Sequence, residues 1–473
     1  MKIVKAPIDR ILQTQISSQF SFGKDSLKRL LSENYPLLSI LIGFMLVALS
    51  IGPYYNGDTA WEYDAVLGVI NYGLPYTNGF YLMDQPPLGF YTQAAFMKAF
   101  GVSISNGVFL VTLFGLGCVA LVYGIGKVMY NKTTGLFAAA LFAFSPWHII
   151  LSRSFLIDVQ CLFFSLFSLF VGILAIRRSS LGLFFVSGIL FTVAFNTKLY
   201  AVFTLIPLIV LFLYNRPSLK RTLSWLAVFS APVLLFYYLW YQTISGLGVT
   251  SIFGHTDFMV HNVSTVVPSF WFIGNFLTAY ALGWFFVDAA IVSVLVCLLQ
   301  RRLFHRFLAF DLTCVAVIVL VLSIDLYLGA VLNLKAPFLN AIKYNYHTLS
   351  FFSFLAASLV TKSLSLLKLT NPKRKLVISF VAAAGLVLVA AALLYNMRFV
   401  NLFSTWDYLI FRVEPTVDVG YSLFTYTLPI QDNFLIGIQY AGFTIALSGL
   451  AWASRHKITR ALKRFSGNPS AIN

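Results

Sequence analysis

The sequence predicts an all-α polytopic membrane protein with about twelve transmembrane helices and a long first external loop. Of its 473 residues, 59% are hydrophobic and 10% are charged, whereas a soluble domain carries about 25% charged residues. Apolar runs of about 20 residues, the length that crosses the hydrocarbon core of a bilayer, recur along the chain. No polar stretch approaches the ~100 residues of a typical soluble domain. The transmembrane bundle is therefore expected to make up most of the protein.

Twelve apolar segments are predicted to cross the membrane. In chain order they cover residues 36–54, 106–126, 133–151, 155–176, 181–196, 199–215, 222–243, 277–299, 307–328, 344–361, 376–396 and 433–453. They divide the chain into a cytoplasmic N-terminal segment, one transmembrane domain and a basic cytoplasmic tail, which cover residues 1–35, 36–453 and 454–473. The long external loops are then residues 55–105, 244–276 and 397–432.

Lysine and arginine are distributed unevenly between the two sides of the membrane. If the N-terminus is cytoplasmic, 26 of the 33 basic residues fall on that side, as the positive-inside rule requires. An even number of spans places both termini in the cytoplasm of a multi-pass cell (plasma) membrane protein. Topology and lipid contact then explain the net charge of +17, and no nucleic-acid partner is indicated. Most carboxylates fall on the extracytoplasmic side, where we expect the working face.

The first external loop is the most informative stretch. Residues Tyr54 to Tyr91 contain four of the 16 carboxylates, namely Asp58, Glu62, Asp64 and Asp84. Hydrophobic residues at helical spacing predict an interfacial helix that ends at Gly73-Leu74-Pro75, and Pro86-Pro87 is expected to begin a second one. The predicted apolar stripe of the first helix is Ala60, Trp61, Val66, Leu67, Val69 and Ile70. Such helices would lie on the bilayer surface and frame a cavity.

Asp58 has two interpretations. A carboxylate just outside the membrane can accept a proton from an incoming hydroxyl group, and an aspartate before an amphipathic run can equally cap a helix. Glu62 lies one helical turn later and would share the face of Asp58. Two like charges at this spacing are easier to understand if they bind a divalent metal ion or divide the roles of acid and base. No other cofactor is indicated.

Further candidates lie at the external ends of later spans. Asp84 and Gln85 precede a double proline, which either starts a helix with a polar cap or aims both side chains into a cavity.

Arg153 and Asp158 occupy the hairpin between the third and fourth spans. Arg153 can clamp a phosphate or extend to lipid headgroups, and Asp158 is an ionisable group just inside the bilayer edge, which favours a functional role.

Two lysines extend this set. Lys198 lies in the short external turn Asn196-Thr197-Lys198, and Lys343 with Tyr344 precedes the tenth span. Either lysine can neutralise a phosphate, and either can be an ordinary interfacial residue. Together with Arg153, they place three cations at the external ends of three hairpins, which favours phosphate binding.

As an ordered set, these residues resemble the GT-C superfamily of lipid-dependent membrane glycosyltransferases, in particular the group that contains protein O-mannosyltransferases and bacterial aminoarabinose transferase. The resemblance covers about residues 36–215. It rests on Asp58 and Glu62, the turn from Gly73 to Tyr76, the corner from Asp84 to Leu88, and Ser152-Arg153 followed by Asp158. It implies jaw-like helices in the first external loop, a polyprenyl-phosphate-linked sugar donor, and transfer on the extracytoplasmic face.

The resemblance also implies roles for individual residues. Asp58 matches the catalytic acidic position, and Arg153 with Asp158 matches the family's arginine–aspartate pair. The family often has a second acid directly after the first, where this chain has Thr59.

A second departure concerns the double proline. The family often has a basic residue or a histidine before it, whereas this chain has Gln85. The donor phosphate is therefore expected to depend more on Arg153, Lys198 or Lys343.

The predicted function is that of an integral membrane glycosyltransferase, similar to hexosyl- and mannosyltransferases of protein glycosylation and the cell envelope. It would transfer a sugar, with inversion, from a polyprenyl-phosphate donor to a protein, glycan or lipid acceptor, with Asp58 as the base. The main alternative is a secondary transporter or lipid flippase, which fits twelve spans but predicts internal repeats and broken helices near the midplane. A third possibility is a non-catalytic assembly subunit of a glycan pathway.

Overall fold

The computed structural model describes residues 24–51, 57–77, 80–81, 86–215, 217–246, 282–331, 345–367, 375–400 and 433–465. The elements in these ranges are α2 (Lys24–Ser50), α3 (Gly57–Tyr72), β1 (Tyr76–Thr77), β2 (Phe80–Tyr81), α4 (Leu88–Phe100), α5 (Ile104–Met129), α6 (Lys132–Ala143), α7 (Pro146–Ser152), α8 (Asp158–Arg178), α9 (Leu181–Phe195), the 3-10 helix η1 (Leu199–Thr204), α10 (Leu205–Tyr214), α11 (Leu219–Ser245), α14 (Trp284–Leu299), α15 (Arg301–Val331), α17 (Thr348–Leu366), α18 (Lys375–Val400) and α20 (Asn433–Phe465). The described part is thus helical apart from two very short strands, which confirms the all-α prediction.

Helices occupy all twelve segments that were predicted as spans. Among the described residues, five helices are long and apolar enough to cross a membrane, namely α5, α8, α11, α15 and α17. α6 and α7 make a sixth if they are taken as one span, which is bent by 63°. The bend falls where Pro146 begins α7, because proline lacks the N–H that would continue the helix. The fold is that of a helical membrane protein, and the number of twelve crossings stays a prediction.

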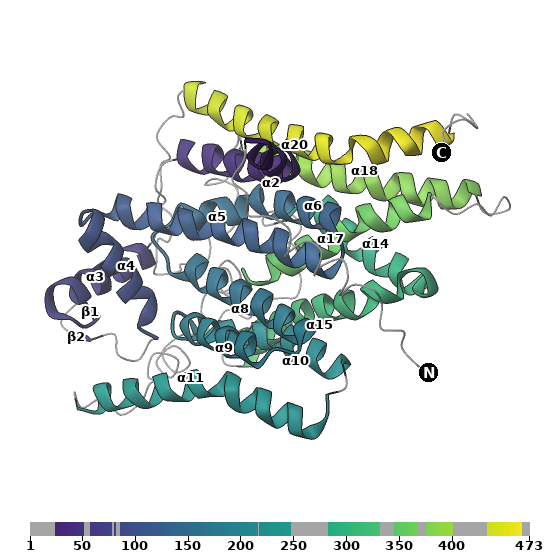
Figure 1. Ribbon diagram of the computed structural model, residues 1–473. Helices are drawn as coiled ribbons and strands as arrows, with labels where there is room; N and C mark the ends of the chain where they lie inside the picture. Colours follow the sequence, from purple (N-terminus) through teal and green to yellow (C-terminus); the bar gives the residue numbers. More distant parts are fainter. Residues whose placement is uncertain are drawn as a thin grey trace.

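The long helices lie side by side in one bundle (Figure 1). α17 lies in the middle and packs against α6, α14, α15 and α18. α8 packs against α5 and α9, and α11 covers α9 at one edge. At the opposite edge α2 pairs with α20, where a Cβ atom added to Gly43 would lie 2.3 Å from the carbonyl oxygen of Gly442. Small residues permit such close approaches between membrane helices.

The segment predicted to be the first external loop contains two helices, which lie at one end of the bundle (Figure 1). α3 and α4 share a hydrophobic cluster that includes Val66 and Phe90. The strands β1 and β2 between them pair antiparallel. Gly73 follows the end of α3 with a φ of +79°, a left-handed conformation that favours glycine. The two helices therefore begin and end close to the residues that the sequence predicted.

The predicted apolar stripe of α3 is wrong in part. Ala60 is exposed, and the buried line of the helix is formed by Thr59, Glu62, Ala65, Val66 and Val69. These residues are spaced three and four apart, so they share one face. A carboxylate, Glu62, thus lies on the face that packs inwards.

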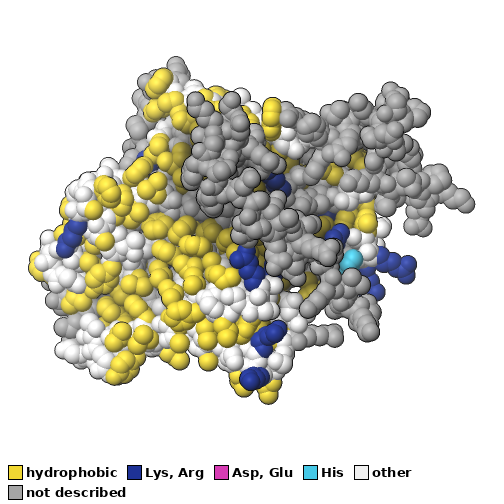
Figure 2. Space-filling view, viewed as in Figure 1, with side chains coloured by type: hydrophobic (Ala, Val, Ile, Leu, Met, Phe, Trp, Pro, Cys, Tyr) yellow, Lys and Arg dark blue, Asp and Glu magenta, His cyan; other side chains and the backbone are white. Residues whose placement is uncertain are grey.

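The outer surface of the described bundle is largely apolar. Figure 2 shows hydrophobic side chains over a broad area of one face. Exposed leucines also recur along α11, including Leu223, Leu226, Leu234 and Leu239. An apolar exterior of this extent is expected of a bundle that faces lipid.

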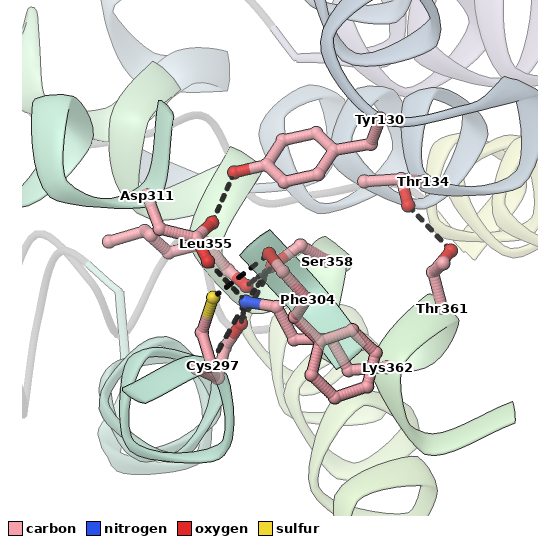
Figure 3. A network of polar contacts seen from close by, with 10 residues as sticks. Tyr130, Thr134, Cys297, Phe304, Asp311, Leu355, Ser358, Thr361 and Lys362 are labelled. Atoms are coloured by element: carbon pink, nitrogen blue, oxygen red, sulfur yellow. Dashed lines mark hydrogen bonds and ion pairs between the residues drawn. The ribbon is translucent and has the colours of Figure 1, made fainter. Parts of the chain in front are cut away.

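A fully buried ion pair joins α15 to α17 (Figure 3). The Nζ atom of Lys362 lies 2.6 Å from Oδ2 of Asp311 and also donates to the carbonyl and hydroxyl oxygens of Ser293, at 3.0 and 2.8 Å. The ammonium donates further to the hydroxyl of Ser358 at 3.0 Å, and the hydroxyl of Tyr130 donates to Oδ1 of Asp311 at 2.6 Å. Both charges therefore have the partners that burial requires.

This network corrects one sequence assignment and explains how α17 is held. The topological count treated Lys362 as a cytoplasmic loop cation, because the tenth predicted span ended at residue 361. α17 continues to Leu366, so Lys362 lies inside the helix. The adjacent Thr361 accepts a hydrogen bond from Asn131 at 3.0 Å and lies 2.7 Å from the hydroxyl of Thr134, which ties the same turn of α17 to the start of α6.

The ion pair predicts a characteristic pattern of stability. Lys362→Met and Asp311→Leu each leave one buried charge without its partner, so each should lower the free energy of unfolding by about 3–5 kcal/mol. The double variant removes both charges and should recover most of that loss. Unfolding of the four proteins in detergent micelles measures the coupling. Additive losses in the double variant would contradict a stabilising role for the pair.

Candidate active site at the start of α8

Glu62 connects α3 to the start of α8. Its Oε2 atom accepts a hydrogen bond of 2.8 Å from the backbone N–H of Ile157, the residue before α8. Its Oε1 atom lies 3.6 Å from Nζ of Lys198. The residue is only 8% exposed. The burial of Glu62 therefore depends on contacts with two other segments of the chain.

Asp158 is the first residue of α8 and is completely buried. Its Oδ2 atom accepts a hydrogen bond of 2.6 Å from Nζ of Lys198, and its Oδ1 atom accepts one from the hydroxyl of Tyr200. A negative charge at a helix N-terminus is also favoured by the helix dipole. Each oxygen of this carboxylate thus has its own donor.

Lys198 lies between the two carboxylates. It follows α9 and directly precedes η1, so its backbone stands at a turn between two helical segments. Its side chain is 15% exposed, whereas the carboxylate of Asp158 is fully enclosed. The ammonium group also lies 5.7 Å from the centre of the Tyr200 ring. Glu62, Asp158, Lys198 and Tyr200, here called the Lys198 cluster, form the candidate site.

Arg153 lies next to this cluster in the sequence but makes different contacts. Its Nε atom donates to the carbonyl oxygen of Ile51 at 2.9 Å, and its Nη1 atom donates to the hydroxyl of Thr112 at 3.1 Å. The side chain is 7% exposed and joins the end of α2 to α5. Arg153 is therefore a buried cation at the same end of the bundle.

The remaining predicted residues are described only in part or not at all. Asp58 lies in the first turn of α3, which begins at Gly57, and its side chain is outside the described atoms. Asp84, Gln85, Lys343 and Tyr344 lie outside the described residues. Nevertheless, the backbone N–H of Leu88 donates to the carbonyl oxygen of Asn196 at 2.9 Å. The double-proline corner thus ends beside the turn that carries Lys198.

Sequence reasoning did not identify two buried aromatic residues near Asp158. The ring of His347 packs edge-to-face against Tyr200, with centroids 4.8 Å apart. Its Nε2 atom lies 3.4 Å from the hydroxyl oxygen of Ser165. The available signals were weak: Tyr200 comes two residues after Lys198, and His347 follows Lys343-Tyr344.

Within the described ranges, no group of three or more histidines, cysteines, aspartates or glutamates could hold a metal ion. The side chain of Asp58, one of the two predicted metal ligands, is outside this search. Glu62 already uses its two oxygens on Ile157 and Lys198. A metal at Asp58 and Glu62 would therefore compete with Lys198 for the same carboxylate.

Burial raises the pKa of Glu62 from 4.5 to about 7. The charge of Lys198 opposes this rise, the negative charge of Asp158 adds to it, and the hydrogen bond from Ile157 opposes it. Ionisation of Glu62 is consequently unfavourable in the folded protein. Its contribution to stability is complete below about pH 4.5 and is lost as the pH rises through 7.

Glu62→Gln should remove this dependence on pH. The shift in pKa corresponds to ~3 kcal/mol, so the variant should gain about that much stability relative to the wild type between pH 4.5 and 8. Unfolding measured in detergent at a series of pH values tests this. Thr59→Val, on the same buried face of α3, changes packing without a titrating group and should keep the wild-type dependence. A constant difference between Glu62→Gln and wild type would exclude a raised pKa.

The fold resembles that of a protein of known structure, ArnT from Cupriavidus metallidurans. The crystal structure of ArnT from Cupriavidus metallidurans in the apo state superimposes with a TM-score of 0.55 and 14% identity, covering 89% of this chain and 77% of the other. The structure of the same protein bound to undecaprenyl phosphate, with the same coverage, gives 0.54 and 15%. This likeness concerns the fold, and with the sequence match below it confirms the predicted resemblance to the GT-C superfamily.

The sequence match is narrower. Residues 84–241 match the family described as dolichyl-phosphate-mannose-protein mannosyltransferase. Two proteins of Bacillus subtilis (strain 168), the candidate mannosyltransferases YycA and YkcB, are 29% identical over 149 residues and 30% identical over 138 residues. These stretches cover 31% and 28% of this chain but only 22% and 19% of the relatives. The family match includes Arg153, Asp158, Lys198 and Tyr200.

Proposed function

We propose that the protein is an integral membrane glycosyltransferase that takes a sugar from a polyprenyl-phosphate donor and transfers it to an acceptor on the extracytoplasmic face. The observation that carries this proposal is the Lys198 cluster. It places the ammonium of a partly exposed lysine between two buried carboxylates, beside α3 and α4. The sequence that resembles mannosyltransferases contains three of its four residues. The bound undecaprenyl phosphate of ArnT supports a donor of this chemical class.

In this proposal Lys198 stabilises the charge of the donor phosphate. Its side chain is the more exposed member of its ion pair with Asp158, which makes it the more accessible of the two to a ligand. Arg153 contributes a second positive charge at the same end of the bundle. The predicted contacts of Asp84 and Gln85 fit this arrangement, because the corner after them bonds to Asn196 through Leu88. Lys343 and Tyr344, which are outside the described residues, precede α17 in the sequence and stay candidates for the same phosphate.

Asp58 is proposed as the general base. The acceptor hydroxyl loses its proton to Asp58 and attacks the anomeric carbon from the face opposite the phosphate. The bond between this carbon and the phosphate oxygen breaks, and its electron pair leaves with polyprenyl phosphate, which inverts the configuration. Base catalysis of this kind contributes about 10²–10⁴-fold, and preorganised charge at the leaving group contributes further.

The finer topology belongs to the same proposal. Twelve spans would place both termini in the cytoplasm, and α3 and α4 would act as jaws over the site at the plasma membrane surface. The prenyl chain would stay in lipid beside the bundle. The acceptor would be a protein, a glycan or a lipid that approaches from outside the cell.

The ion pair of Lys362 and Asp311 favours a second candidate, a secondary transporter or lipid flippase. Charges inside a membrane bundle often line a substrate or proton pathway. Here both side chains have no exposed surface, and both are satisfied by neighbouring groups. This arrangement is better explained as a structural contact, so the glycosyltransferase is the proposal that we develop.

The proposal predicts that Asp58→Asn abolishes donor turnover. We would reconstitute the purified protein with a panel of polyprenyl-phosphate sugars and a membrane extract as acceptor. Loss of the base should lower the rate by about 10²–10⁴-fold while thermal stability stays unchanged. Asp64→Asn is the matched control, because it removes the same charge from an exposed position on the same helix.

Other outcomes separate the candidates. Equal turnover by wild type and Asp58→Asn would remove Asp58 from the chemistry. Turnover that survives in Asp58→Asn but is lost with large disruptive changes would favour an assembly subunit. No turnover with any donor, together with movement of a labelled solute or lipid across the bilayer, would overturn the glycosyltransferase in favour of a transporter or flippase.

A further inference from the structure

The two oxygens of Asp158 accept hydrogen bonds from two different residues, Tyr200 and Lys198. The phenol donates to Oδ1, and the ammonium of Lys198 donates to Oδ2 at 2.6 Å. A carboxylate that is held at both oxygens by different groups cannot rotate without breaking a hydrogen bond. The orientation of Asp158 is therefore fixed by Lys198 together with Tyr200, a residue that carries no charge.

This orientation determines where Lys198 lies. The ammonium stands 2.6 Å from Asp158 and 3.6 Å from Glu62, so it bonds directly to one carboxylate and is only near the other. Without the phenol, both oxygens of Asp158 would become available to the ammonium. The ammonium would then be able to shift along the carboxylate from Oδ2 towards Oδ1, and a displacement of about 1 Å at a reacting group can cost ~10²-fold in rate.

The ring of Tyr200 is itself held in place by α17. His347 packs against it edge-to-face, with an interplanar angle of 84°. His347 is completely buried and stands at the N-terminus of α17. Its Nε2 atom lies 3.4 Å from Ser165 Oγ and 3.9 Å from Cys161 Sγ, both on α8. A continuous line of contacts thus connects α17 to the ammonium of Lys198 through Tyr200 and Asp158.

We propose that Tyr200 and His347 are positioning residues, which keep the ammonium of Lys198 in place for the phosphate of a lipid-linked donor. Tyr200 acts by occupying one oxygen of Asp158, and His347 acts by fixing the plane of the Tyr200 ring. This inference rests on the proposed function of the Lys198 cluster. It differs from a packing role because the phenolic oxygen, and not only the ring, is required.

The test measures binding of undecaprenyl phosphate to the full-length protein in detergent. Tyr200→Phe keeps the ring and removes the hydroxyl, and should weaken binding about tenfold, the range of one charge-assisted hydrogen bond. Lys198→Met should weaken it at least as much. The double variant should bind no more weakly than Lys198→Met alone, because Tyr200 acts only through Lys198. Additive effects, or binding by Tyr200→Phe within twofold of wild type, would overturn the inference.

His347 is tested by a pair of variants. His347→Phe keeps an aromatic edge against Tyr200 and should bind undecaprenyl phosphate nearly as wild type does. His347→Leu removes that edge and should resemble Tyr200→Phe, with no added effect when Lys198→Met is also present. The matched control is Tyr63→Phe, which removes a phenol from α3 whose ring packs against Phe155 at 5.5 Å. Equal binding by the two His347 variants would overturn the role of His347.

The same measurements separate this inference from the proposed function. Wild-type protein that binds undecaprenyl phosphate with the predicted coupling, but transfers no sugar from any donor, would overturn the function and leave the positioning role supported. Sugar transfer by wild type, with Tyr200→Phe indistinguishable in both binding and rate, would overturn the positioning role alone. Wild-type protein that binds no polyprenyl phosphate would overturn both.

Discussion

One ammonium group shared by two buried carboxylates determines how the end of the bundle near α3 is built. Glu62 comes from the first external loop, Asp158 from α8 and Lys198 from the turn after α9, so three distant segments must meet before the charges are compensated. Removing an ion from water costs several kcal/mol. Each carboxylate therefore has a further donor, the amide of Ile157 for Glu62 and the phenol of Tyr200 for Asp158. Glu62 thus adds a polar contact between α3 and the residue before α8 to the apolar cluster that Val66, Phe155 and Ile157 share.

The second buried ion pair shows what distinguishes a structural contact from a candidate site. Lys362 and Asp311 have no exposed surface, and the ammonium is surrounded by acceptors from α14, α15 and α17. Lys198 has the same tight contact with its aspartate but keeps 15% of its side chain exposed. Its second carboxylate stands beyond hydrogen-bonding distance. The exposed part of Lys198 is what the proposed function requires for contact with a donor phosphate, whereas a ligand at Lys362 would first have to separate packed helices.

The sequence predicted the helices well because long apolar runs leave few alternatives inside a membrane. It predicted Asp158 and Lys198 as separate candidates but not their contact, since they are 40 positions apart in the sequence and nothing local encodes the packing of α8 on α9. The buried position of Glu62 was missed because the predicted stripe of α3 counted only hydrophobic residues. The ion pair of Lys362 was missed because the predicted span ended one residue too early.

Tyr200 and His347 escaped prediction for a different reason. Aromatic residues are abundant in this chain, at 17% of all positions, and several of the described ones, such as Phe142 and Phe354, are packed in the core. A tyrosine that holds a carboxylate has no local signature in such a background. Only the fold identifies it, by bringing η1, α8 and the start of α17 together around one side chain.

The same geometry bears on Gln85, which stands before the double proline where the resembling family often has a basic residue or a histidine. A basic residue at position 85 would precede Leu88 by three residues, and Leu88 bonds to Asn196, two residues before Lys198. Two cations would then approach one phosphate and one another. With a neutral Gln85, Lys198 would bear more of the charge compensation at the phosphate. The placement of Lys198 between Asp158 and Glu62 would then matter more. Tyr200 and His347, the uncharged residues that hold Asp158 in place, are therefore the residues at which this site is best tested.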